Sequence, residues 1–280
     1  MGMIEANGIR THYQRMPARN ATADKPPTVV CVHGLGYDSL ASFYLTLAAP
    51  VSQAGIDVVT YDLRAHGRTD RPMSGYRLAD FVEDLRAVLD GTGVEGPVHL
   101  VGNSFGGTIA FSFAERYPER VLSIVAIEAE PATDEWARKM GSTLSNVVDW
   151  MQDQQVLDWL ELTFGSHHAR LSKIAGAMIA ATTIVEEVPQ GPLLDAAAMR
   201  GIRCPVLSIV GSEGFQADDL TAVASALPDC RTEVIEGQNH SVLVERHRTV
   251  RELLLAWIEE IEDAARPSAV RPSYAGRVLT

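Results

Sequence analysis

Short apolar runs of strand type alternate with helix-like patterns along most of this chain, and this alternation limits the fold more than any other feature. Parallel strands need crossover connections, usually helices, so the pattern predicts an α/β fold with a mainly parallel sheet and helices on both faces. Two of the expected helices are Leu78–Leu89 and Thr108–Tyr117. The expected buried strands are Thr28–His33, Val58–Asp62, Val98–Gly102, Leu122–Ile127, Val206–Gly211 and Arg231–Ile235.

The two ends of the chain and one long connection complete this outline. Asn7-Gly8, between short alternating stretches, predicts an opening β-hairpin. The connection between Ile127 and Val206 is much longer than one crossover needs, and helix-like patterns at Asp149–Leu160 and Leu171–Ile184 predict an inserted helical cap. We therefore expect an α/β core formed by residues 1–130 and 201–265, a cap at 131–200 and a C-terminal tail at 266–280.

The composition and the chain ends restrict partners and location. A chain of 280 residues with 46% hydrophobic content can bury a large core, and a net charge of −12 disfavours nucleic acid and anionic membranes as partners. The three cysteines have no ligand or disulfide spacing, so no metal is expected. No signal peptide or membrane span is found, which favours a cytoplasmic location. We expect the tail to pack on its own domain or on a neighbouring subunit, so the sequence leaves open whether the protein forms a homodimer.

Residues 102–106 read Gly-Asn-Ser-Phe-Gly, a G-x-S-x-G pattern between the strand-like run Val98–Val101 and a helix-like stretch. In such a tight strand-to-helix turn, the flanking glycines let the serine adopt a strained backbone conformation that exposes its hydroxyl above the sheet edge. Ser104 is therefore predicted to be a nucleophile. The amide of Phe105, at the start of the following helix, is predicted to be one donor of an oxyanion hole.

Two further segments support this interpretation. The run Thr28–Val32 ends in the loop His33–Gly36, from which the Leu35 amide can supply a second oxyanion donor. The run Thr232–Ile235 leads to a loop that holds His240, the predicted general base. A serine that precedes its histidine is the chain order of α/β-hydrolases, whereas chymotrypsin-type and subtilisin-type enzymes use other orders.

On these motifs the chain resembles the α/β-hydrolase superfamily over nearly its whole length, which implies an eight-stranded sheet with an inserted cap. The segments at 33–36, 62–69 and 102–107 are similar to the family's oxyanion loop, its loop after the fourth strand and its nucleophile elbow. Asn103 and Phe105 within the elbow resemble the meta-cleavage-product hydrolases, which split carbon–carbon bonds. His33 and His66 are expected to shape loops by hydrogen bonding.

The acidic member of the expected triad departs from the family pattern. A carboxylate is needed to orient His240, and most members keep an aspartate at the position where this chain has Gly214. We prefer Glu128, which follows the predicted strand Leu122–Ile127, because the haloalkane dehalogenase and zearalenone lactonase branches hold their acid at that site and the spacing resembles theirs. Glu213 lies one residue early, and a one-residue slip at a strand end reverses the side-chain direction. The alternatives that stay open are Glu213, Asp218, Asp219 and Glu130, or a site with no acid at all.

Together these features predict a serine hydrolase that cleaves an ester or lactone of an apolar small molecule through Ser104, His240 and Glu128. No cofactor is expected, because the chain has no Walker loop and no dinucleotide motif. A carbon–carbon hydrolase with the same residues, or a hydrolase-like receptor that holds a small molecule at a slow site, are the alternatives. The predicted pocket residues are Gly34, Asn103, Trp136, Trp150 and Trp159.

Overall fold

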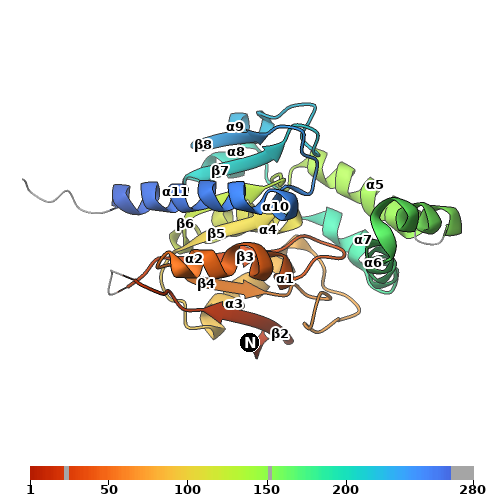
Figure 1. Ribbon diagram of the computed structural model, residues 1–280, viewed down its shortest axis with the longest axis horizontal. Helices are drawn as coiled ribbons and strands as arrows, with labels where there is room; N and C mark the ends of the chain where they lie inside the picture. Colours follow the sequence, from red (N-terminus) through yellow and green to blue (C-terminus); the bar gives the residue numbers. More distant parts are fainter. Residues whose placement is uncertain (22–24, 151–152, 266–280) are drawn as a thin grey trace, which may run out of the picture.

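The computed structural model describes residues 1–21, 25–150 and 153–265, and an eight-stranded sheet runs through its centre in the order β1-β2-β4-β3-β5-β6-β7-β8 (Figure 1). The pairs β1–β2 and β2–β4 are antiparallel, and all other neighbours are parallel. The predicted fold class is confirmed. The strands are β1 (Gly2–Ala6), β2 (Ile9–Met16), β3 (Thr28–Val32), β4 (Asp57–Tyr61), β5 (Val98–Asn103), β6 (Val121–Ile127), β7 (Val206–Gly211) and β8 (Cys230–Ile235).

The local sequence accounts for these strands. Each predicted parallel strand agrees with the observed one to within one residue at either end, because buried parallel strands are apolar on both faces. The opening hairpin turns at Asn7 and Gly8, whose φ angles of 50° and 79° lie in the left-handed region that these two residue types adopt most readily. The predicted hairpin is therefore confirmed.

Helices cover both faces of the sheet, and the alternation within single strands explains how. In β3, Val30 and Val32 belong to one buried cluster, while Val29 and Cys31 belong to the other. The first cluster also contains side chains of α3 (Leu78–Gly91), α4 (Phe105–Arg116), α8 (Ala196–Gly201) and α9 (Ala222–Ala226). The second contains side chains of α1 (Leu40–Phe43), η1 (Tyr44–Ala48), α2 (Ala49–Gln53), α10 (Val242–Glu245) and α11 (His247–Ala265), of which α2 and α11 lie in front of the sheet in Figure 1.

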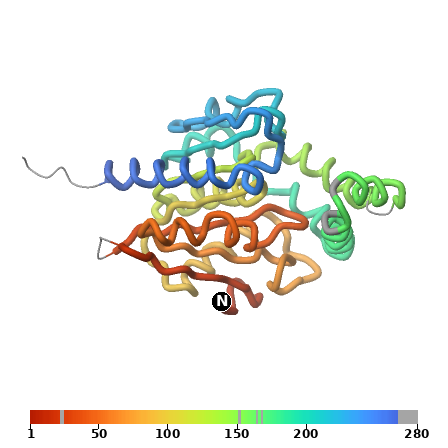
Figure 2. The backbone as a smooth tube through the Cα atoms, viewed as in Figure 1, coloured from red at the N-terminus to blue at the C-terminus, as the bar shows by residue number. Residues whose placement is uncertain are grey.

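The long connection between β6 and β7 carries helices that extend beyond the sheet (Figure 1, right). They are α5 (Asp134–Trp150), α6 (Gln154–Ala180), α7 (Ile184–Glu187) and the 3-10 turn η3 (Val188–Gln190); a further such turn, η2 (Pro118–Arg120), precedes β6. Within α6 the backbone departs from helical geometry at Gly165, where φ is 85° and ψ is 162°. The backbone trace in Figure 2 has the same arrangement, with the segment between β6 and β7 protruding from the layered part of the molecule.

The two helices predicted for this connection have wrong boundaries. The predicted helix Asp149–Leu160 contains a break, because α5 ends at Trp150 and α6 begins only at Gln154. Asp153 marks this start by accepting a hydrogen bond from the Gln155 amide at 2.8 Å, an N-cap that competes with a continuous helix. The second predicted helix, Leu171–Ile184, also contains a break, since α6 ends at Ala180 and Ile184 begins α7.

The parallel strands bring distant parts of the chain to one edge of the sheet. Ser104 follows β5 and donates its amide to the Ile127 carbonyl at 2.8 Å, and Glu128 follows β6 and donates its amide to the Ile209 carbonyl at 2.9 Å. The loops after β3, β5, β6, β7 and β8 therefore all open at this edge. No helix within the described ranges combines the length and hydropathy that a membrane crossing requires. The predicted tail and its proposed dimer contact lie outside the described residues.

Candidate active site

The turn between β5 and α4 holds Ser104 in a strained conformation, with φ of 52° and ψ of −123°. Two close approaches require glycine around it. A Cβ at Gly102 would overlap the backbone of Gly107, and a Cβ at Gly106 would overlap the carbonyl of Val32. The turn can therefore be this tight only because these positions lack side chains, and the half-buried serine lines a cavity at the sheet edge.

The structure brings Ser104, His240 and Glu128 into one hydrogen-bonded chain. The distance from Ser104 Oγ to His240 Nε2 is 2.9 Å, and the distance from His240 Nδ1 to Glu128 Oε2 is 3.2 Å. Because a carboxylate only accepts hydrogen bonds, the histidine carries its proton on Nδ1 and presents the Nε2 lone pair to the serine. This tautomer is the one that a general base needs.

Glu128 is fully buried, and backbone amides help to hold its carboxylate. Oε1 accepts from the Gly211 amide, and Oε2 accepts from the Phe215 amide at 3.4 Å. A Cβ at Gly214 would overlap this carboxylate. The position where most relatives of this fold would carry the acid is thus empty of side-chain atoms, and the carboxylate of Glu128 fills that space from the neighbouring strand.

The other carboxylates that sequence reasoning left open do not reach His240. Glu213, Asp218 and Asp219 are exposed, and Asp219 accepts hydrogen bonds from the amide and hydroxyl of Thr221. Glu130 instead pairs with a lysine of α5 at 2.7 Å. Among the described residues, Glu128 alone contributes a carboxylate within hydrogen-bond distance of His240.

Both predicted oxyanion donors lack a hydrogen-bond partner within the described part of the chain. The Phe105 amide is the first of α4, where no earlier carbonyl of the helix can accept it. The Leu35 amide lies in the loop after β3, and its neighbours are held on both sides. The Gly34 amide donates to Asp38 Oδ2 at 2.8 Å, and the Gly36 amide donates to His66 Nε2 at 2.9 Å.

His33 and His66 shape this loop, as predicted. The Nδ1–H group of His33 donates to the Gly34 carbonyl at 2.7 Å, while its Nε2 accepts from the Leu63 amide at 3.0 Å. His66 accepts from Gly36 and donates from Nδ1 to the Arg64 carbonyl at 2.8 Å. Burial, with a smaller contribution from the neighbouring His33, lowers the pKa of His66 from 6.5 to about 3, so the ring is neutral at pH 7.

The buried His66 makes the protein sensitive to acid. Below pH 6.5 the unfolded chain binds a proton at His66, whereas the folded state resists protonation until about pH 3. We therefore expect the free energy of unfolding to fall by up to about 1.4 kcal/mol per pH unit between pH 6 and pH 4 from this residue. Urea unfolding at several pH values should give a shallower slope for His66→Gln than for the wild type. Equal slopes would refute the assignment.

A cavity of about 110 Å³ opens beside Ser104, between the sheet edge and α5. Its walls are mostly apolar or aromatic and include Phe105, Ala129, Trp136, Met140 and Phe215. Trp136 is 4% exposed and stacks on Phe105 with ring centroids 6.3 Å apart and planes at 10°. Of the predicted pocket residues, Trp136 is therefore the one that lines this cavity.

The remaining predicted pocket residues lie elsewhere. Gly34 is next to Ser104, since a Cβ at Gly34 would be 3.4 Å from the serine Cβ, and the Asn103 amide nitrogen lies 3.5 Å from Asp38 Oδ2. Neither lines the cavity. Trp150 and Trp159 are 51% and 55% exposed and are also absent from its walls, because they lie near the α5–α6 break, away from the sheet edge.

Sequence reasoning missed two residues of this site. Phe215 packs its ring on His240 with centroids 4.0 Å apart, and Lys139 of α5 donates to Glu130 Oε1 and to the Phe215 carbonyl. Phe215 directly follows Gly214. The absence of the usual aspartate at position 214 is therefore a sequence signal that could have pointed to this loop. Lys139 belongs to an amphipathic helix, and its sequence context does not distinguish it from a solvent-facing lysine.

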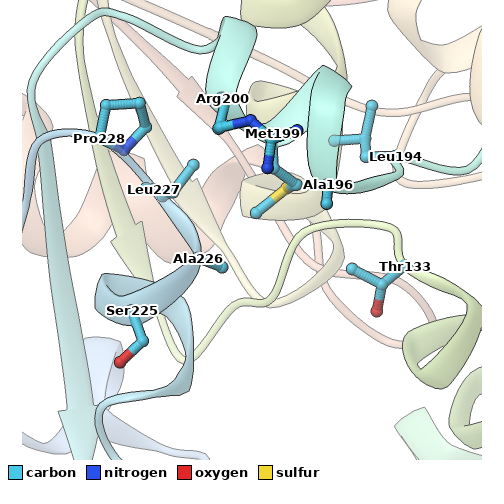
Figure 3. Close-up of a pocket in the computed structure, with 9 residues that line it drawn as sticks. All are labelled: Thr133, Leu194, Ala196, Met199, Arg200, Ser225, Ala226, Leu227 and Pro228. Carbon is cyan, nitrogen blue, oxygen red and sulfur yellow. The ribbon is translucent and has the colours of Figure 1, made fainter.

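A second hollow, of about 670 Å³, lies between α8, α9 and the segment after β6 (Figure 3). Thr133, Met199 and Leu227 contribute to its walls, and none of the predicted site residues does. The three cysteines are free thiols. Within residues 1–21, 25–150 and 153–265, no three histidine, cysteine or acidic side chains gather as they would around a metal ion.

The sequence model of the alpha/beta hydrolase fold family matches residues 27–172, which is more than half of the chain. This protein therefore belongs to that family, and it is an enzyme. Its structure is similar to that of a carboxylesterase from the thaumarchaeon Nitrososphaera gargenis, with a TM-score of 0.74 at 19% identity, covering 94% of this chain and all of the other. At this identity the likeness concerns the fold.

Two curated relatives show how the similarity is distributed. A Bacillus subtilis protein named "Putative 2-succinyl-6-hydroxy-2,4-cyclohexadiene-1-carboxylate synthase" is 26% identical over 87% of this chain and 96% of its own length. The 2-hydroxy-6-oxononadienedioate/2-hydroxy-6-oxononatrienedioate hydrolase of Paraburkholderia phymatum is 38% identical, but over only 42% of this chain and 39% of its own length. Other relatives also match over about a third of their length.

Proposed function

We propose that this enzyme is a serine hydrolase that cleaves an ester or lactone of a small, largely apolar molecule through Ser104, His240 and Glu128. The observation that carries the proposal is the continuous hydrogen-bonded chain from Ser104 Oγ through His240 to the Glu128 carboxylate. A serine hydroxyl that lines a cavity, a histidine of the correct tautomer and a buried carboxylate behind it are the components of an activated nucleophile.

In the first half of the reaction, His240 Nε2 takes the proton of Ser104 as Oγ attacks the substrate carbonyl carbon. The carbonyl oxygen becomes an oxyanion, and the free amides of Leu35 and Phe105 are suited to bind it, with a contribution of about 3 kcal/mol per donor. The buried Glu128 carboxylate stabilises the imidazolium that forms. His240 then gives its proton to the leaving alkoxide, which departs as the alcohol and leaves an acyl-enzyme.

In the second half, water replaces the alcohol. His240 takes a proton from the water as its oxygen attacks the acyl carbon, and the same two amides bind the second oxyanion. Collapse of this intermediate releases the carboxylic acid and returns the proton to Ser104 Oγ. For a lactone, the alcohol and the acid belong to one product, so ring opening requires the same steps. No group other than the three side chains and the two amides is needed.

The cavity supports an apolar substrate of modest size. Apolar side chains form much of its walls, Thr108 and Thr143 add neutral polar groups, and the ion pair of Lys139 with Glu130 lies at its edge. Trp136, held flat against Phe105, provides an apolar surface beside the nucleophile. A volume of about 110 Å³ suits a short acyl chain or a small lactone ring before any movement of the cap.

Carbon–carbon bond hydrolysis is the second candidate. It is favoured by Asn103 and Phe105 in the elbow and by the similarity of part of the chain to the hydrolase of Paraburkholderia phymatum. The same three side chains serve either reaction, so the products must decide. Release of a dienoate from a ring-fission dienol, with no turnover of esters or lactones, would replace our proposal with this one.

The proposal predicts a covalent adduct on one serine. A fluorophosphonate probe should react with Ser104, because only an activated serine attacks such phosphorus centres rapidly. Peptide mass spectrometry locates the adduct, and a panel of short esters, lactones and thioesters identifies the substrate class. His240→Ala should slow labelling at least about 100-fold. An unlabelled Ser104 would contradict the proposal and favour a receptor that binds its ligand without turnover.

A further inference from the structure

Lys139 is the one positively charged side chain among the described residues that line the cavity beside Ser104. It lies on α5, and its side chain is 47% exposed. Its ammonium group has two acceptors, Glu130 Oε1 at 2.7 Å and the Phe215 carbonyl at 3.0 Å. The first belongs to the segment after β6 and the second to the loop after β7. Lys139 therefore connects a cap helix to two loops of the sheet edge.

Phe215 is the element of this network that touches the candidate triad. Its amide donates to Glu128 Oε2 at 3.4 Å, and its ring packs 4.0 Å from the ring of His240. Its carbonyl is the group that Lys139 binds. One residue thus contacts the acid, the base and the cap. Gln216 ties the same loop to the Ala129 carbonyl at 3.1 Å, so the loop is fixed on its far side as well.

Burial alone does not fix the position of Phe215, so the hydrogen bond from Lys139 to its carbonyl matters for the loop. The residue is 56% exposed, and an aromatic ring of that exposure has other rotamers available in solvent. A hydrogen bond from an ammonium group to its carbonyl restricts the backbone of the loop, and this in turn keeps the ring over His240. The ring excludes water from one face of the imidazole and limits its rotation.

We propose that Lys139 is a positioning residue, which holds Phe215 against His240 and so couples the cap helix α5 to the geometry of the triad. Lys139 acts through Phe215 and does not bind the substrate. This inference rests on the proposed function, since it concerns the same site. It goes further in making the rate of hydrolysis depend on a contact between the cap and the loop after β7.

A double-mutant cycle tests the coupling with a short neutral ester that has no charge for Lys139 to bind. Lys139→Met removes the donor and keeps the length of the side chain, and we expect kcat to fall about 10-fold with KM changed less than about 2-fold. Lys139→Arg keeps a donor and should restore most of kcat. Phe215→Ala should lower kcat to a similar degree, and Lys139→Met should cause no further loss in that background.

The exposed Lys173 of α6 supplies the matched control, because Lys173→Met makes the same change of charge without a partner in this site and should leave kcat unchanged. Additive losses in the double variant would overturn the proposal. So would a loss confined to KM for anionic esters, which would make Lys139 a substrate-binding residue.

A measurement without substrate separates this inference from the proposed function. The Phe215 ring shifts the NMR signals of the His240 ring protons, which are assigned by their loss in His240→Gln. We expect Lys139→Met to move these signals toward those of Phe215→Ala, and Lys173→Met to leave them in place. Unmoved signals would overturn the inference even if Ser104 proves to be the nucleophile. Moved signals without any Ser104-dependent turnover would instead indicate that the proposed function has failed.

Discussion

Ser104→Ala is expected to lower kcat for the best ester or lactone substrate by about 10⁴-fold to 10⁶-fold, with a KM close to that of the wild type. In the proposed mechanism the Ser104 hydroxyl forms the acyl-enzyme, and its removal leaves His240, 2.9 Å from the serine oxygen in the wild type, with no serine to activate. The residual rate would come from the oxyanion donors and from substrate binding. Steady-state kinetics measure the effect.

Ser112 offers a control on the same helix. It is buried on α4, and its hydroxyl has no hydrogen-bond partner in the described residues, so Ser112→Ala removes a serine at little cost. We expect its kcat to match the wild type. Thermal unfolding of Ser104→Ala should stay within about 4 °C of the wild type, because the replacement removes one oxygen atom that lines a cavity. Retention of more than about 1% of kcat by Ser104→Ala would exclude the acyl-enzyme mechanism.

The second large effect concerns Glu128. Glu128→Gln keeps the shape of the side chain but removes the charge that stabilises the imidazolium, and we expect kcat to fall about 10⁴-fold. The fall should be similar for every substrate, because the carboxylate acts through its hydrogen bond to His240. Glu213→Gln is the matched control, since Glu213 is exposed and has no reach to His240. A large loss in Glu213→Gln would show that the acid has been misassigned.

Gly214 allows a stronger test of the same assignment. Gly214→Asp alone should destabilise the protein and abolish activity, because its Cβ would overlap the Glu128 carboxylate and a second negative charge would be buried beside the first. In the Glu128→Ala background the Glu128 carboxylate is absent, so the overlap is relieved. The carboxylate introduced by Gly214→Asp then occupies the position usual in the family. We expect the double variant to exceed Glu128→Ala in kcat by about 10-fold or more.

The outcome of this exchange is decisive either way. If Gly214→Asp is as harmful in the Glu128→Ala background as alone, the two positions do not share one space, and the close approach between them has no functional meaning. If the double variant gains activity, the acid of this enzyme can be moved between two strands while the histidine stays in place. Circular dichroism and thermal unfolding of all three variants ensure that activity is compared among folded proteins.

The sheet could be predicted in detail because its signals are local. Buried parallel strands such as β3 and β7 are short apolar runs, and the turn at Asn7-Gly8 needs two residues that tolerate a positive φ. The helices between β6 and β7 could not be predicted to the same accuracy. The break at Asp153 depends on a capping hydrogen bond that competes with helix continuation, and apolar periodicity does not report that competition.

The same distinction between local signals and tertiary packing applies to the candidate site. Ser104 and the amide of Phe105 could be found because the elbow is one short segment in which the glycines, the strand and the helix all constrain each other. Trp136 could not be distinguished from Trp150 and Trp159 by sequence, since all three lie in helices of the same connection between β6 and β7. Only the orientation of α5 against the sheet edge makes the first a wall of the cavity and leaves the others exposed.

The sequence by itself determined the fold, the strained turn at Ser104, the loop that offers the Leu35 amide and the late histidine, because each depends on residues that are neighbours in the chain. The tertiary structure alone decided which carboxylate faces His240 and which side chains surround it. Glu128 follows β6, whereas Gly214 and Phe215 lie together in the loop after β7, and the distances between them follow from the register of β6 beside β7 and from the way that loop folds. Contacts between residues so far apart in the chain are set by packing, whereas the local sequence sets only the individual strands, helices and turns.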